Sequence, residues 1–502
     1  MALQLVDWPS AMTFQQSLIR FSSAYALGYV SNVSPKLSKL AVAQIRGKQD
    51  KSVAFSKAYQ ILIAALGPNR FPAFCGIVIG GSTSFQIPIY RWLAQLNSIA
   101  QSQNRRLSIV TIARLARFVA AFIASWLGIH LLNSSRSLSA SRQNVASNEM
   151  HCSSTNIKNV EKSNNQPRSL VPEDGKTIDL TLFAITRAAD VIVGEIWSRF
   201  RSKKMTRKRE RLLDFIGSSI DAGIFALSSG TIMWTWFYQP HRLPKSYNQW
   251  ISEAAQIDPR LISALREARY GSFTYGRDTG HAALLQSMCK DYGWPLEWGD
   301  PAKSIPIPCE MVHMGTGPSC EKHSLVRFGR AFKFALATYL PLNLLVRARS
   351  TPSLRTLRRA LRDAVRSSTF LGAFVAIFYY SVCLARTRLG PKVFSHNTIS
   401  PLAWDSGLCV RAGCILCGWS ILIEAQRRRQ EIAFFVAPRA LGTLFPRRYD
   451  RKYQWRETLA FALSTAVVFT CVQEKPERVR GVLGNLLKKL LSSQPRRMVT
   501  PH

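Results

Sequence analysis

Acidic residues are scarce in this chain, and their scarcity sets the first limits on what the protein can be. The 502 residues include 29 Asp and Glu against 67 Lys and Arg, a formal net charge of +38. Such an excess is typical of proteins that bind nucleic acid or an anionic membrane surface. The basic residues flank apolar stretches and form no stripe with stacking aromatic residues. We therefore predict membrane lipids as partners and no nucleic acid.

Signatures of the common enzyme classes are also missing. The sequence has no Walker-type phosphate loop, no G-x-S-x-G elbow and no H-E-x-x-H motif. Its 10 cysteines are scattered, which excludes the disulfide framework of a small secreted domain. The N-terminus shows no secretory signal and is instead poor in acid and rich in serine. We predict a protein that is not an enzyme and has no catalytic residues.

Clean apolar runs are lacking too, yet eight stretches approach the roughly 20 residues that cross a bilayer. They lie near 71–93, 109–132, 178–200, 215–238, 367–386, 404–425, 431–446 and 457–473. The first four stretches and the last four share a pattern. Arg187 is followed by FALSS at 225–229, and Arg439 is followed by FALST at 461–465. Internal repeats are common in membrane proteins. We predict an all-α, multi-pass membrane protein of two four-helix repeats, with a large soluble all-α protein as the alternative.

Composition divides the chain into five predicted regions. They are a basic N-terminal arm (1–52), a first membrane repeat (53–238), an extramembrane linker containing Cys and His (239–325), a second membrane repeat (326–474) and an amphipathic basic tail (475–502). The second repeat includes a preceding apolar helix at 331–346, with 53–66 as its upstream counterpart.

Two connections inside the first repeat have distinct compositions. Residues 134–176 are rich in Ser, Asn and Gln, which predicts a disordered loop. Residues 199–211 form a basic loop that we expect to contact anionic lipid or a targeting receptor. Its basic residues are Arg199, Arg201, Lys203, Lys204, Arg207, Lys208, Arg209 and Arg211.

Small residues at helical spacing predict close helix packing. Gly76 and Gly80 recur as Gly372 and Ala376, and such pairs let two helix backbones approach within lipid.

Four charges are predicted at membrane depth: Arg187, Asp190, Asp221 and Arg439. A buried charge needs a partner or a watery cavity, so we expect Arg187 and Asp190 to face Asp221 or the arginines Arg114 and Arg117. A structural ion pair and a shallow, snorkelling position are the alternatives to a polar cavity.

One cluster of residues has the chemistry of a metal site. Cys309, His313, Cys320 and His323 fall within fifteen residues, and thiolate and imidazole are the usual ligands of structural zinc. Their spacing matches no standard zinc finger. A disulfide between Cys309 and Cys320, or free thiols, are the alternatives.

The same region carries a resemblance. CEMVH at 309–313 and PSC at 318–320, followed by an apolar stretch at 332–345 and FLGAF at 370–374, resemble the cysteine-rich opening of the transmembrane protein 135 family. That family is distantly similar to the four-helix protein translocases of the mitochondrial inner membrane. The resemblance implies a fungal-type arrangement, in which the cysteine-rich linker joins two repeats. It also implies a peroxisomal or mitochondrial membrane and a link to lipid metabolism and organelle dynamics.

These observations favour a membrane scaffold or a conduit for lipid, metabolite or protein. One alternative is a membrane organiser that recruits protein partners through 239–325 and the basic loops without transport. The other is a zinc-dependent membrane enzyme. We expect no cofactor other than structural zinc.

Overall fold

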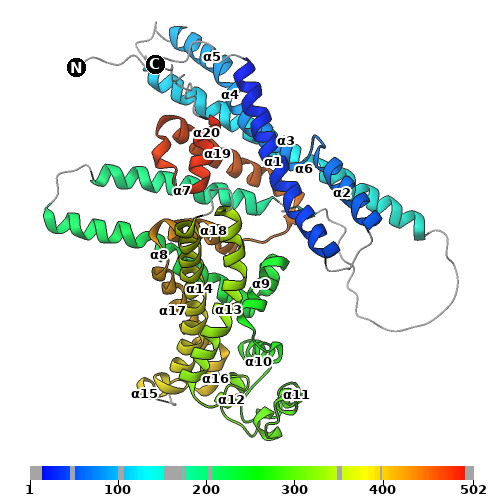
Figure 1. Cartoon of the computed structure of the whole chain (residues 1–502), viewed down its shortest axis with the longest axis vertical. Coiled ribbons are helices and arrows are strands. Elements are labelled where there is room, and N and C mark those ends of the chain that lie inside the picture. The colour runs from blue at the N-terminus through cyan, green and yellow to red at the C-terminus, as the bar shows by residue number, and fades with distance from the viewer. Residues whose placement is uncertain are drawn as a thin grey trace. The chain divides into compact units, whose positions relative to one another are not determined.

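The fold is built almost entirely from helices (Figure 1). A computed structural model describes residues 14–45, 51–99, 107–151, 173–174, 177–201, 206–347, 353–395 and 398–491. Within them, two short strands pair antiparallel, β1 (Glu173–Asp174) and β2 (Tyr449–Asp450). Because each of these strands is only two residues long, the predicted all-α fold class is confirmed. The chain forms two compact units, unit 1 (Met1–Lys204 with Arg448–His502) and unit 2 (Met205–Arg447).

Unit 1 combines the N-terminal helices with the last two. It contains α1 (Phe14–Ile45), α2 (Lys51–Ala65), α3 (Phe71–Gly76), η1 (Ile77–Gly81), α4 (Ser82–Ser84), α5 (Gln86–Ile99), α6 (Ile109–His151), α7 (Ile178–Arg201), η8 (Arg451–Tyr453), α19 (Gln454–Glu474), η9 (Pro476–Arg478) and α20 (Gly481–Leu491). Helix α19 packs against both α6 and α7. Its Phe461 meets Phe74 of α3 with ring centroids 5.7 Å apart.

Unit 2 contains the helices in between. They are α8 (Arg207–Tyr238), η3 (Pro240–Arg242), α9 (Lys245–Ala255), α10 (Pro259–Tyr270), α11 (Ala282–Tyr292), η4 (Leu296–Gly299), α12 (Cys309–Val312), α13 (Cys320–Arg347), α14 (Leu354–Cys383), η5 (Leu384–Arg388), α15 (Gly390–Val393), α16 (Pro401–Ala403), η6 (Trp404–Leu408), α17 (Cys409–Cys417), η7 (Gly418–Ile423) and α18 (Gln426–Leu444). Helix α8 packs against α17 and α18, and α13 packs along α14.

Local sequence explains where several of these helices begin and end. The Ser353 hydroxyl caps α14 by accepting a hydrogen bond from the Thr356 amide, and Asp258 caps α10 in the same way through Arg260. Helix α10 has a proline in its first turn and ends at Gly271, whose φ of 85° few other residues adopt.

Six of the described helices are long and apolar enough to cross a membrane. They cover Phe71–Ile99, Ile109–Ser134, Arg207–Tyr238, Leu354–Val393, Pro401–Ile423 and Arg451–Glu474. The sequence predicts eight spans, two more than these six. The predicted spans near 178–200 and 431–446 do form helices, α7 and α18, but neither is among the six. Both carry several charged residues, which lower their mean hydropathy.

The two units do not follow the predicted boundaries of the repeats. Helix α8 was predicted to complete the first four-helix repeat, yet it belongs to unit 2. Helix α19 was predicted to complete the second, yet it belongs to unit 1. In each case the apolar face of the fourth helix finds its partners on helices from the other half of the chain. An apolar stripe does not encode which complementary stripe covers it, so the sequence pattern could not reveal this exchange.

Three smaller predictions also differ from the structure. Residues 14–45 of the predicted basic arm form α1, which packs on α3. Residues 134–151 of the predicted disordered loop continue α6, and 152–172 lie outside the described residues. Helix α20 in the predicted tail buries Leu487 and Leu491 against the core of unit 1. The amphipathic α20 gains stability by covering apolar surface.

Candidate functional site

An apolar cavity of about 490 Å³ lies inside unit 2. Helices α8, α9, α13, α14 and α18 contribute side chains to its wall, among them Phe225, Ile251, Tyr339, Val375 and Val436. Its volume falls within the range of about 300–1,000 Å³ seen for sites that hold small ligands. Two of the contributing helices, α8 and α14, belong to the candidate membrane spans.

Aromatic packing fixes one side of this cavity. The Phe225 ring of α8 lies 5.6 Å from the ring of Phe370 and 6.3 Å from that of Phe374, both edge-on, between ring centroids. Farther along, the ring of Phe237 stacks on that of Phe378 at 5.5 Å. Such pairs add about 0.5–1.5 kcal/mol each to the gain from burial. They hold α8 and α14 together beside the open space.

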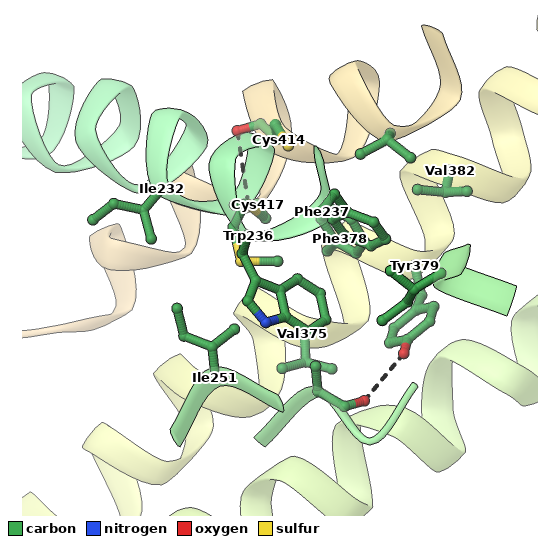
Figure 2. Packing of buried hydrophobic residues seen from close by; sticks show 14 of the residues in the cluster. Ile232, Trp236, Phe237, Ile251, Val375, Phe378, Tyr379, Val382, Cys414 and Cys417 are labelled. Atoms are coloured by element: carbon green, nitrogen blue, oxygen red, sulfur yellow. Dashed lines mark hydrogen bonds between the residues drawn. The ribbon is translucent and has the colours of Figure 1, made fainter. Parts of the chain in front are cut away.

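Helix α9 forms another side of the cavity and is tied in place by two hydrogen bonds. Figure 2 shows Ile232, Ile251 and Val375, from three different helices, around the indole of Trp236. That indole donates to the Ser252 hydroxyl of α9 at 3.1 Å. The Tyr379 hydroxyl of α14 donates to the Ala255 carbonyl at 3.1 Å. The wall is therefore anchored to both spanning helices and does not depend on apolar contact alone.

Two phenols form part of the cavity wall, and the guanidinium of Arg439 lies beside it. Burial raises the pKa of the Tyr247 and Tyr339 phenols. The Arg439 guanidinium lies 3.6 Å from the centroid of the Phe435 ring and 5.6 Å from that of the Tyr247 ring, and both rings line the cavity. Arg439 thus places a positive charge at the edge of an apolar space.

The predicted metal ligands are only partly brought together. His313 and Cys320 lie with Cys383 of α14 in a buried group whose ligand atoms are all within 4.8 Å of one another. Cys309 and His323 are not in that group. Cys309 and Cys320 are free thiols, so the structure does not contain the alternative disulfide between them.

A buried ion pair lies near this cluster and was missed by the sequence reading. Arg386 of η5 makes two bonds to Asp405 of η6, with Nε–Oδ1 at 2.5 Å and Nη2–Oδ2 at 2.9 Å. Tyr275 donates to the same carboxylate at 2.5 Å, and Arg386 Nη2 also donates to the Ile307 carbonyl at 2.7 Å. These bonds join two candidate spans to Tyr275, which follows α10, and to Ile307, which precedes α12.

The predicted packing residues lie at two matching contacts. In unit 1, Gly76 and Gly80 both face Phe21 of α1, and a Cβ on Gly80 would lie 2.7 Å from that of Phe21. In unit 2, Gly372 faces Phe328 of α13, where a Cβ would lie 3.0 Å from the ring. One turn along, the Ala376 carbonyl accepts a hydrogen bond from Ser324 at 3.2 Å. Each small residue makes room for the helix that precedes it.

Two of the predicted membrane charges, Arg187 and Asp190, contact a segment near the C-terminal end of the chain. Asp190 pairs with Arg480, and Arg187 Nη1 donates to the Arg480 carbonyl at 3.3 Å. Arg114 pairs with Glu474 instead, with Nε–Oε1 at 2.8 Å, as does Arg117 with Nη1–Oε1 at 3.6 Å. Asp221 is buried in α8. The last residue of α19, Glu474, and the segment after this helix supply these partners, and no periodicity in the sequence marks them.

The basic loop is described only in part. Arg199 and Arg201 end α7, and Arg207, Lys208, Arg209 and Arg211 begin α8; all six side chains are exposed. Arg199 Nε lies 3.4 Å from a carboxylate oxygen of Glu195 on its own helix. Lys203 and Lys204 lie outside the described residues.

Comparison with family models, with curated proteins and with solved structures finds no match to this chain.

Proposed function

We propose that the protein is an integral membrane protein that binds an anionic lipid, holding its acyl tail in the apolar cavity of unit 2. Such a site would serve a scaffold or conduit of the transmembrane protein 135 type, in a peroxisomal or mitochondrial membrane. The cavity itself carries the proposal. An apolar space between helices that can span a membrane is suited to a hydrocarbon chain, because the tail finds surroundings there as apolar as the bilayer core and leaves no polar group of the protein unpaired.

The position of Arg439 supports an anionic head group. Its guanidinium lies against two cavity-lining rings, and a cation beside an apolar space favours an amphipathic ligand with a negative end. A carboxylate or a phosphate would serve equally well as that end. The sequence predicts that Arg439 is a charge at membrane depth, and in the proposed complex this charge binds the head group.

Matching contacts in the two units support the further proposal of two repeats with exchanged fourth helices. In unit 2, Phe225 of α8 meets Phe370 of α14; in unit 1, Phe461 of α19 meets Phe74 of α3. In each contact, one phenylalanine comes from the first half of the chain and the other from the second half. Phe225 and Phe461 hold equivalent positions in the recurring pattern, and so do Phe370 and Phe74. The glycine contacts with Phe21 and Phe328 follow the same correspondence, and they favour α1, in place of the stretch 53–66, as the counterpart of α13.

The decisive experiment is photolabelling in membranes with an alkyne-tagged, photoreactive long-chain fatty acid. We expect labelled peptides from α8, α9 and α14 that include cavity residues. Ala254 lines the cavity, so Ala254→Trp should fill it and lower labelling by about fivefold or more, since overpacking costs about 1–3 kcal/mol. Arg439→Gln should weaken competition by a fatty acid more than competition by its uncharged alcohol.

Gln249→Trp is the matched control, because Gln249 is exposed on the same helix. It should leave labelling unchanged. Equal labelling of the wild type and Ala254→Trp would refute a tail in the cavity and favour an organiser without a lipid site. Release of the protein from membranes by alkaline carbonate would refute membrane integration.

A further inference from the structure

The cluster of His313, Cys320 and Cys383 has a geometry that suits a metal ion. The three side chains are buried, and their ligand atoms lie within 4.8 Å of one another. His313 Nε2 and Cys383 Sγ are 3.4 Å apart. Two zinc ligands at about 2.1 and 2.3 Å, held at a tetrahedral angle, are themselves roughly 3.5 Å apart. The pair therefore already has the separation of two ligands of one ion.

The backbone orients His313 toward the thiols. Its Nδ1 lies 2.8 Å from the Gly317 carbonyl, so Nδ1 carries the proton and Nε2 presents its lone pair to Cys383. A tight turn makes this bond, with Gly315 at φ 79° and Gly317 at φ 95°. The same turn returns the chain so that Cys320 reaches the group. A carbonyl that fixes the tautomer in this way is the usual support of a metal-bound histidine.

A fourth donor lies close by. Cys309 precedes His313 by four residues around α12, and its thiol interacts with the Thr387 hydroxyl, one helical turn beyond Cys383.

His323 has a different position from the one predicted. Its ring stacks on His313 with centroids 4.6 Å apart and an interplanar angle of 18°, and its Nδ1 lies 2.6 Å from the Thr316 hydroxyl. This stacking holds the ring of His313 in place.

We propose that His313, Cys320 and Cys383 bind one Zn²⁺ and that Cys309 completes the site as the fourth ligand. Thiolates with an imidazole select zinc among the common divalent ions. Each thiol loses its proton on binding, so negative sulfur balances the buried ion. Four protein ligands leave no open position, which makes the centre structural. It fastens the segment between α12 and α13 to the end of the membrane helix α14.

The test uses the full-length protein, expressed with zinc and purified in detergent without chelator. We expect about one zinc per chain by elemental analysis. Titration with a mercurial thiol reagent should release that zinc to a metallochromic dye. Replacement by Co²⁺ should give the strong thiolate-to-cobalt absorption of a tetrahedral site. Cys320→Ser and Cys383→Ser should each lower the zinc content at least about tenfold.

Cys289→Ser is the matched control, because Cys289 is also buried in the extramembrane part of unit 2 but lies outside the cluster. It should retain its zinc. If the cluster variants fail to fold, the wild-type protein still tests the proposal, because the mercurial reagent must release one zinc per chain from it. Wild-type protein without zinc above the blank, or a disulfide between Cys320 and Cys383 in non-reducing peptide mapping, would overturn the proposal.

Discussion

The buried pair of Arg386 and Asp405 gives the sharpest test of how unit 2 is held together. Both side chains are almost fully removed from solvent, with 4% and 1% exposed. Asp405→Asn removes the negative charge and leaves the arginine uncompensated. We expect this single change to destabilise unit 2 far more than any surface substitution.

The magnitude follows from the partners that remain. Removing one member of a buried pair typically costs about 3–5 kcal/mol. Arg386 would keep its bond to the Ile307 carbonyl, so the lower end, about 3 kcal/mol, is expected. For a unit of this size, that corresponds to a fall in Tm of about 6–12 °C. The double variant Arg386→Met with Asp405→Leu removes both charges and should regain most of the loss, because neither ion then has to be desolvated.

The assay is thermal unfolding of the purified protein in one detergent, followed by tryptophan fluorescence. Arg388 offers a control on the same helical segment: it pairs with Glu321 at 2.9 Å, but the two side chains are 52% and 46% exposed. Arg388→Gln should change stability by less than about 1 kcal/mol. A shift for Asp405→Asn no larger than that of Arg388→Gln would refute the reasoning. So would a double variant less stable than the single one.

Two further predictions concern packing and pH. Gly80→Ala should destabilise unit 1 by about 1–3 kcal/mol, since its new Cβ would meet Phe21. Gly194→Ala, with open space around it inside α7, should leave stability unchanged or raise it by up to about 1 kcal/mol in the same melting assay. The hydrogen bond from Arg260 lowers the pKa of Asp258, so this carboxylate contributes stability above its unfolded pKa near 4, and the contribution is lost as pH falls through the lowered folded value. Asp258→Ala should cost about 0.5–2 kcal/mol at pH 7 and less at acidic pH; an equal cost at both would contradict this.

Much of the local structure could be predicted from the sequence. The apolar stretches identified most of the long helices, and the spacing of Gly76 and Gly80 pointed to a place where helices approach closely. Cys309, His313 and Cys320 stood out because they are near one another in the chain. All of these are short-range signals, which helical periodicity and residue chemistry encode directly.

The functional details depended on contacts between distant segments. Cys383 lies in an apolar helix, where a cysteine is indistinguishable from any small hydrophobic residue. Arg480 and Glu474, the partners of Asp190 and Arg114, come from the far end of the chain. The cavity depends on how side chains of five helices leave space between them, and packing of that kind has no sequence pattern.

The sequence alone determined that the chain is helical, strongly basic and rich in segments suited to a membrane, because periodicity, charge and apolar length are properties of neighbouring residues. Only the tertiary structure decided that α8 joins unit 2 and α19 joins unit 1. The physical reason is that apolar faces attract one another without regard to chain order. The partner of a given helix is chosen by shape, as where Phe225 fits against Phe370 and Phe461 against Phe74.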